Sequence, residues 1–256
     1  MLLTLVATGA WGLGVTRRRQ ARRDWTRTQE VALVILQQAE VPRRTLDALV
    51  SRTGALEQRL SAEMARHGRP GLQPFALTPL GPLEAPAPPR VGADDGLGAR
   101  AQDWWALRKW RRPLEAAVGG TDRFDLVVYV IVHAAARGGA RLAEGFAAKG
   151  GELGLVETTI DDRSVDFALI AVGHELLHLF GATDKYDAQG HAIATGLVEP
   201  ALGLPQRRAE IMVGEIPLGP GRGRVATRLD ELGVGPVTAR EIGWISAAAQ
   251  TGVPTP

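Results

Sequence analysis

The first half of the chain carries apolar residues at three- and four-residue spacing in two blocks, residues 24–40 and 43–67. This spacing places the apolar side chains on one face of an α-helix. Pro42 separates the blocks, and proline ends helices because it has no amide hydrogen. The pattern therefore predicts a helical hairpin over residues 24–68 with an apolar inner face. A partner-binding coiled coil is the weaker alternative, because the heptads are not sustained.

Residues 69–98 break this pattern with seven of the sixteen prolines, and the segment ends in PAPPRVGADDGLG. Such a composition predicts a linker or an irregular surface segment. Within it, QPFALTPL could form a short edge strand. The next stretch, DWWALRKWRRPLEAA at residues 103–117, predicts a helix whose tryptophans pack in the ordinary way.

The clearest strand is FDLVVYVIVHA, residues 124–134, because it is rich in β-branched residues and apolar on both faces. GELGLVETTI, residues 151–160, predicts a second strand. Residues 165–180 predict a helix with Ser164 at its N-cap, since a serine there can accept a hydrogen bond from a free backbone amide. Two strands followed by this helix indicate an α+β domain over residues 99–250.

The C-terminal stretch GPVTAREIGWIS predicts one more helix. Thr238 and Glu241 have the spacing of a capping box, in which each side chain binds a backbone amide near the start of the helix. Trp244 is expected to lie in the core. This helix is therefore assigned to packing.

The absence of cysteine from the 256 residues excludes a disulfide scaffold, a thiolate zinc site and a cysteine nucleophile. A metal would therefore be bound by His, Asp or Glu. The net charge of +2 is uneven, since residues 1–30 carry +4 and leave −2 on the rest of the chain. A nucleic-acid-binding domain shows a basic face throughout its fold, so no nucleic-acid partner is expected.

The N-terminal segment, residues 1–23, joins the uncharged run MLLTLVATGAWGLGV to the basic run TRRRQARR. A helix of 15 residues spans about 22 Å, less than the roughly 30 Å hydrocarbon core of a membrane. The segment predicts membrane association as a short anchor, or else a helix that lies at the interface or is buried in protein. If the segment spans a membrane, its arginines favour a cytoplasmic location for the domain that follows.

The candidate catalytic and metal-binding residues lie in the segment HELLHLFGATDKYD, which begins at His174. His174 and His178 are four residues apart on the predicted helix, so both project from one face and can share a metal. Glu175 is placed so that its carboxylate can reach a water on that metal without being a ligand. Gly181 permits the positive φ that ends a helix, and Asp184 can then supply a third ligand.

The chain contains other histidine and glutamate residues that could bind a metal. His191 and Glu199 are alternative third ligands, although both lie in predicted loops. His133 ends a strand, and His67 ends a helix where a cation suits the helix dipole, so both are expected to be structural.

The run HELLHLFGATD resembles the HExxHxxGxxH/D signature of the metzincin clan of zincin metallopeptidases, in its snapalysin-like form with Asp184 at the last position. The run onward to REIGW also resembles uncharacterised bacterial HExxH proteins. The resemblance implies a zincin-like domain with a mixed sheet and an active-site helix, in which Zn²⁺ is bound by His174, His178 and Asp184. It also implies that Met212 in AEIMVG forms the methionine turn, although Gly214 stands where a tyrosine is often found.

The resulting prediction is a zinc metallopeptidase in which Glu175 is the general base and the substrate is a protein or peptide. Tyr186 could orient the Asp ligand or stabilise an oxyanion, with plain packing as the alternative, whereas Lys185 and Asp187 are expected to be solvated. Residues 152–160 would form the edge of the cleft and pair with an extended substrate. The competing hypothesis is a non-hydrolytic, zinc-stabilised interaction module tethered to a membrane, which would not need Glu175.

Overall fold

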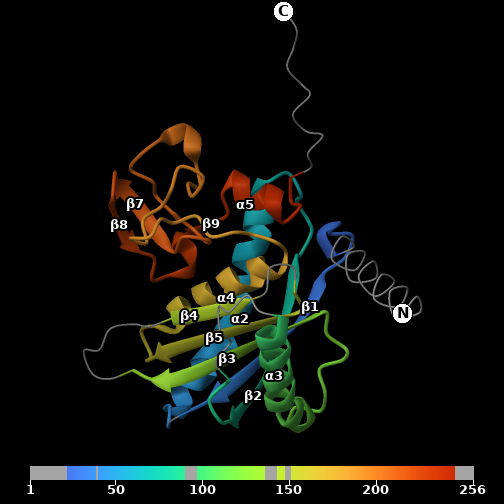
Figure 1. The fold of residues 1–256 in the computed structure, drawn as a ribbon. Coiled ribbons are helices and arrows are strands. Elements are labelled where there is room, and N and C mark those ends of the chain that lie inside the picture. The colour runs from blue at the N-terminus through green and yellow to red at the C-terminus, as the bar shows by residue number, and fades with distance from the viewer. Residues whose placement is uncertain (1–21, 39, 90–96, 136–142, 148–150, 246–256) are drawn as a thin grey trace, which may run out of the picture.

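The computed structural model describes residues 22–38, 40–89, 97–135, 143–147 and 151–245, which are coloured in Figure 1. Within these ranges, none of the helices combines the length and the apolar character needed to cross a membrane. The membrane segment predicted at residues 1–23 lies almost entirely outside the described residues and stays a prediction.

A mixed five-stranded sheet forms the centre of the fold (Figure 1). Its strand order is β2-β1-β3-β5-β4, and all neighbours are parallel except β4, which runs antiparallel to β5. This mixed sheet with its helices confirms the predicted α+β class. The strands are β1 (Gln29–Gln37), β2 (Phe75–Glu84), β3 (Leu126–Ala134), β4 (Ala143–Ala147) and β5 (Leu153–Ile160).

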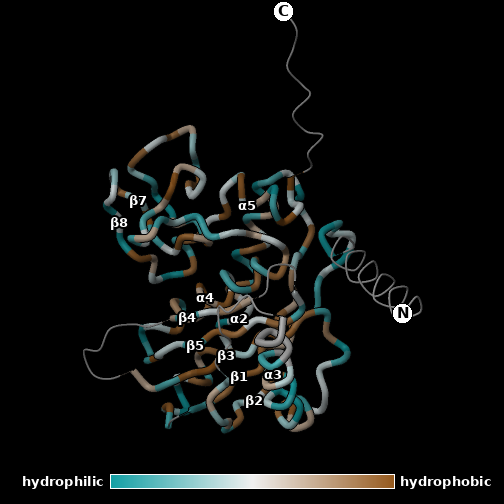
Figure 2. The backbone as a smooth tube through the Cα atoms, in the orientation of Figure 1, coloured by the Kyte–Doolittle hydropathy of each residue, from teal (hydrophilic) through white to brown (hydrophobic). Residues whose placement is uncertain are grey.

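Helices cover both faces of the sheet. α2 (Arg43–Arg66) and α4 (Val165–Leu179) lie on one face, and α3 (Leu97–Ala117) lies on the other (Figure 1). Because side chains of a strand alternate between faces, each central strand contributes to two cores. In β1, the core under α2 and α4 receives Val31, Leu33 and Ile35, and the core under α3 receives Ala32, Val34 and Leu36. Figure 2 shows the corresponding hydrophobic stretches along the central strands.

The helix predicted over residues 24–40 is wrong, because this stretch forms β1. The six residues from Val31 to Leu36 are all buried, and a continuous apolar run fits helical spacing as well as a strand covered on both faces. Its β-branched residues favour the strand. The second helix of the predicted hairpin is confirmed as α2, and QPFALTPL is confirmed as the edge strand β2.

The remaining predicted elements are present as α3, β3, β5 and α4, whereas β4 was not predicted. β1 and β2 belong to the same sheet as β3, so this sheet includes residues from the predicted hairpin and from the proline-rich segment 69–98. Ser164 does occupy the N-cap of α4, but its side chain makes no capping bond and instead accepts a hydrogen bond from the amide of Asp161.

The chain after α4 forms a C-terminal lobe, residues 181–245, drawn from orange to red in Figure 1. In this lobe, β6 (Ala209–Glu210) pairs in parallel with β9 (Leu232–Gly233), and β7 (Glu215–Gly219) forms an antiparallel hairpin with β8 (Arg222–Val225). The lobe ends in the short helix α5 (Pro236–Glu241).

An aromatic cluster holds the C-terminal lobe against the sheet. The ring of Trp25 stacks on Phe180 at a centroid distance of 4.6 Å and meets Trp244 edge-on at 6.0 Å. Trp25 Nε1 also donates a hydrogen bond to the carbonyl of Ile242 at 2.7 Å. The predicted core position of Trp244 is therefore confirmed.

The predicted capping box of the last helix is not formed. α5 begins at Pro236 after Gly235, because proline is suited to the first position of a helix, so Thr238 lies inside the helix. The carboxylate of Glu241 is consequently available to bind residues outside α5.

Candidate metal centre

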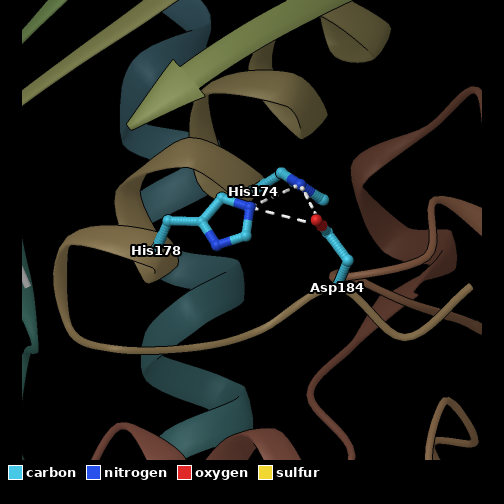
Figure 3. A group of neighbouring side chains, drawn as sticks. All are labelled: His174, His178 and Asp184. Atoms are coloured by element: carbon cyan, nitrogen blue, oxygen red, sulfur yellow. Dashed lines mark hydrogen bonds and ion pairs between the residues drawn. The ribbon is translucent and has the colours of Figure 1, made fainter. Parts of the chain in front are cut away.

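The end of α4 brings three candidate ligands together. His174 and His178 are one turn apart on this mostly buried helix, which ends at Leu179. Gly181 then adopts the predicted positive φ, here 101°, and donates its amide to the carbonyl of His178 at 2.9 Å. This reversal returns the chain toward the histidines, and Asp184 points at both of them (Figure 3).

The three ligand atoms form a nearly equilateral triangle. His174 Nε2 and His178 Nε2 are 3.1 Å apart, and Asp184 Oδ1 lies 3.2 Å from the first and 3.3 Å from the second. A tetrahedron with metal–ligand bonds of about 2.0 Å has edges of about 3.3 Å. The side chains therefore fit three corners of a tetrahedral zinc site, and the fourth corner remains for water or substrate.

Hydrogen bonds to backbone carbonyls fix the tautomer of both histidines. His174 Nδ1 lies 3.0 Å from the carbonyl oxygen of Ile211, and His178 Nδ1 lies 2.9 Å from that of Ala182. A carbonyl oxygen can only accept, so each Nδ1 is the donor, and in the neutral imidazole the Nε2 atom is left with a lone pair that can bind a metal. Carbonyl partners of this kind are typical of metal-bound histidines.

The electrostatics of the triad also favour a cation. Burial lowers the pKa of His178 below its ordinary value. Burial acts in the same direction on His174, but the hydrogen bond with Asp184 and the charge of Glu175 outweigh it and raise the pKa of His174. The hydrogen bond with His174 in turn lowers the pKa of Asp184, so this carboxylate is ionised at neutral pH.

Glu175 is buried at the site without being part of the triangle. Its side chain is 7% exposed, and Oε1 lies 3.9 Å from His174 Nε2. Among the described residues, Oε2 has no hydrogen-bond partner. Burial raises the pKa of Glu175 to about 7, although His174 lowers it in part. A buried carboxylate with a pKa near neutrality is suited to accept and release a proton.

Gly145 of β4 packs directly against the Glu175 side chain. A Cβ atom at this position would overlap the carboxylate of Glu175. No pattern in the sequence points to this residue, because Gly145 lies 30 positions from Glu175 in a short strand that carries no strand signal. The contact depends on the antiparallel pairing of β4 with β5 and on the packing of α4 against the sheet.

Tyr186 lies beside the third candidate ligand. The pKa of Tyr186 is raised by burial and by the charge of the neighbouring Asp184 carboxylate. The phenol therefore keeps its proton at neutral pH and can offer it to Asp184. The contact supports the ligand-orienting alternative for Tyr186 over plain packing.

Met212 is buried in a turn, residues 210–214, that contacts His174. The amide of Gly214 donates to the carbonyl of Glu210 at 2.9 Å and closes the turn. The carbonyl of Ile211, in the same turn, is the acceptor for His174 described above. The turn thus touches the site through its backbone, and the role of Met212 as a methionine turn stays a prediction.

A cavity of about 890 Å³ opens beside the triad. One wall is α4, another is β4, and the far wall includes residues 213–215 and Val225. β4 is the edge strand next to this cavity, whereas β5 lies between β3 and β4. The prediction that residues 152–160 form the edge of the cleft is therefore wrong, because the unpredicted strand β4 covers that edge.

The other candidate ligands are engaged elsewhere. His191 faces Glu215, with Nδ1 3.2 Å from its carboxylate, and Glu199 pairs with Arg208 at 3.2 Å. His133 pairs with Glu157 on β5 at 2.8 Å. Within the described residues, only His174, His178 and Asp184 form a group with metal-binding geometry.

No protein-family model and no curated protein matches the chain. Among solved structures, it is similar to archaemetzincin from Methanopyrus kandleri, with 16% identity and a TM-score of 0.34, over 64% of this chain and 78% of that one. It is also similar to OgpA from Akkermansia muciniphila, with 11% identity and a TM-score of 0.35, over 86% of this chain and 62% of that one. Both TM-scores are below 0.5, so these likenesses assign no function to the chain.

Proposed function

We propose that this protein is a zinc-dependent metallopeptidase that hydrolyses peptide bonds. The observation that carries the proposal is the ligand triangle with edges of 3.1–3.3 Å, in which two histidines have their tautomers fixed by carbonyls. A buried, unpartnered carboxylate lies beside this triangle. Three protein ligands with a fourth open position are the usual arrangement of catalytic zinc sites, and structural zinc sites are closed.

The ligand set favours zinc over other divalent ions. Two imidazoles and one carboxylate suit zinc, whereas magnesium and calcium prefer oxygen ligands alone. A bound zinc ion supplies Lewis acidity, which polarises a carbonyl group and makes a water more acidic.

Glu175 carries the proton transfer in this proposal. Its carboxylate lies 3.9 Å from His174 Nε2 and lines the same cavity as the triangle. It takes a proton from the attacking water and then delivers it to the leaving amine nitrogen. Tyr186 holds the Asp184 carboxylate through its hydroxyl and so limits the orientations open to that ligand.

The proposed substrate is an extended peptide laid along β4. One side of β4 pairs with β5, and its residues also line the cavity. An extended peptide can add to such an edge through backbone hydrogen bonds while its side chains enter adjacent pockets.

Glu175 also separates the peptidase from the alternative of a zinc-stabilised interaction module. A buried carboxylate oxygen without a hydrogen-bond partner destabilises a fold by about 1–3 kcal/mol or more. A module that uses zinc only for stability gains nothing from this cost, whereas a peptidase needs a free carboxylate at this place.

The proposal is tested with the full chain, by measuring its zinc content and its cleavage of casein before and after chelation. We expect one zinc per chain, loss of cleavage with 1,10-phenanthroline, and recovery when zinc is added back. Cleavage that persists in zinc-free protein would exclude the mechanism. One zinc per chain without cleavage of casein or of a peptide library would favour the interaction module.

Replacing Gly145 by alanine tests the placement of Glu175. The new methyl group would displace the Glu175 carboxylate, and a misplacement of about 1 Å can lower a rate by about 100-fold. We expect casein cleavage to fall by about 10–100-fold while the zinc content stays at one per chain.

The matched control for this variant is Gly154→Ala on β5. A Cβ at position 154 would lie 3.6 Å from its nearest neighbour, which is ordinary contact, so activity should change less than about twofold. Equal activity of the two variants would contradict the assigned contact between Gly145 and Glu175.

A further inference from the structure

Lys185 is among the most deeply buried charged residues in the described part of the chain. Its side chain is 2% exposed, and Nζ forms an ion pair of 2.7 Å with Glu241 of α5. The expectation that Lys185 is solvated is therefore wrong, while Asp187 is exposed as expected. A buried ammonium group needs a charge partner and further hydrogen bonds. Here the charge partner comes from a helix 56 residues away, and the further hydrogen bonds come from Thr183.

The same carboxylate binds both neighbours of the third candidate ligand. Glu241 Oε2 accepts from the amide of Thr183 at 3.0 Å, and Oε1 accepts from its hydroxyl at 2.8 Å. Lys185 Nζ also donates to the carbonyl and to the hydroxyl of Thr183, both at 2.6 Å. Thr183, Lys185 and Glu241 thus form a closed network, here called the Glu241 clamp, around the backbone that carries Asp184.

The loop needs such support because its own secondary structure is minimal. Asp184 follows the end of α4 in a stretch without helix or strand, and its side chain is 44% exposed. The amide of Lys185 donates to the carbonyl of Met212 at 3.1 Å, which ties the loop to the turn that contacts His174. The clamp therefore restrains both residues adjacent to the ligand and connects them to α5 and to the turn.

We propose that the Glu241 clamp is a positioning device that sets the metal affinity of the site by holding Asp184 toward His174 and His178. This inference rests on the proposed zinc site and adds residues that do not touch the metal. Asp184 is the only ligand of the three outside α4, so its placement depends on the loop, whereas the helix already aligns the two histidines.

The decisive variant is the double replacement Lys185→Met with Glu241→Leu. Removing one partner would leave a buried charge and destabilise the fold, whereas replacing a buried ion pair by apolar residues of similar size is often neutral for stability. The double variant keeps the packing but loses every hydrogen bond to Thr183. We expect the zinc dissociation constant of the full chain to rise by about 10–100-fold, the range for loss of partners that orient ligands.

Two further readouts separate positioning from a merely structural role. The melting temperature of the metal-free double variant should stay near that of the metal-free wild type. The visible absorption of the Co²⁺-loaded protein should weaken or shift, because it reports the geometry around the ion. Thr183→Val keeps the shape of the side chain but removes the bridging hydroxyl, and it should raise the zinc dissociation constant several-fold. If the double variant does not fold, this single variant tests the clamp.

The matched control is Arg27→Met with Asp125→Leu, a pair in which a carboxylate likewise binds a cationic side chain and a backbone amide. Arg27 donates to both carboxylate oxygens at 2.6 Å, and the amide of Glu30 donates at 2.9 Å. Its zinc affinity should match that of the wild type. Wild-type zinc affinity and Co²⁺ spectrum in the clamp variants would overturn the clamp alone, whereas a wild-type chain that binds no zinc would overturn the proposed function with it.

Discussion

Replacing Glu175 by glutamine is expected to lower the rate of casein cleavage by about 100- to 10,000-fold, the usual contribution of a general base. Glutamine has nearly the same shape but cannot take a proton from water. Because Glu175 is not one of the three atoms of the ligand triangle, the zinc content of the variant should stay at one per chain. The measurement is the cleavage rate together with the zinc content of the same preparations.

The control for this variant is Glu157→Gln on β5. Glu157 is half-exposed and pairs with His133, outside the residues that line the cavity beside the triad. We expect it to cleave casein at the wild-type rate. Undiminished cleavage by the Glu175→Gln protein would remove Glu175 from the mechanism, and loss of zinc from that protein would reassign it as a ligand.

Replacing His178 by alanine is expected to raise the zinc dissociation constant by more than about 100-fold, because loss of a residue that merely orients a ligand already costs about 10–100-fold. The variant keeps only His174 and Asp184, which cannot supply three corners of a tetrahedron. Cleavage of casein at stoichiometric zinc should be lost as well. Competition with a chromophoric chelator measures the affinity.

His133→Ala is the matched control, since it removes an imidazole from the sheet and leaves the triangle intact. Its zinc affinity should equal that of the wild type. If His178→Ala binds zinc as tightly as the control does, the ion is held elsewhere and the assignment of this centre is wrong.

The elements that the sequence predicted correctly are those with an unambiguous local pattern. α2 and α4 have helical spacing over many residues, and β3 and β5 are β-branched strands between glycines or polar turns. β1 was assigned to a helix because its apolar run is continuous, and burial on both faces removes the alternation that marks a strand. β4 was missed because a five-residue edge strand, AEGFA, has almost no apolar pattern.

In the candidate site, too, the residues set by a local pattern were predicted and the residues brought together by folding were not. His174, His178 and the glycine that ends α4 lie within eight residues, so helix geometry alone places them together. The partners that support them come from far along the chain. Ile211 is 37 residues from His174, and Glu241 is 56 residues from Lys185. The residue types of these partners do not reveal their roles in the sequence. Every residue has a backbone carbonyl like that of Ile211, and the position of Glu241 fits a capping box as well as an ion pair.

By itself, the sequence placed the two candidate histidine ligands, the proposed base Glu175 and the helix reversal at Gly181, because these depend on the periodicity of one helix and on the φ angle of one glycine. Tertiary structure alone decided that β4 borders the cavity, that Gly145 packs on Glu175, and that a buried lysine anchors the Asp184 loop. These features depend on strand order and on contacts between distant segments, which packing of the whole chain selects and no local pattern encodes.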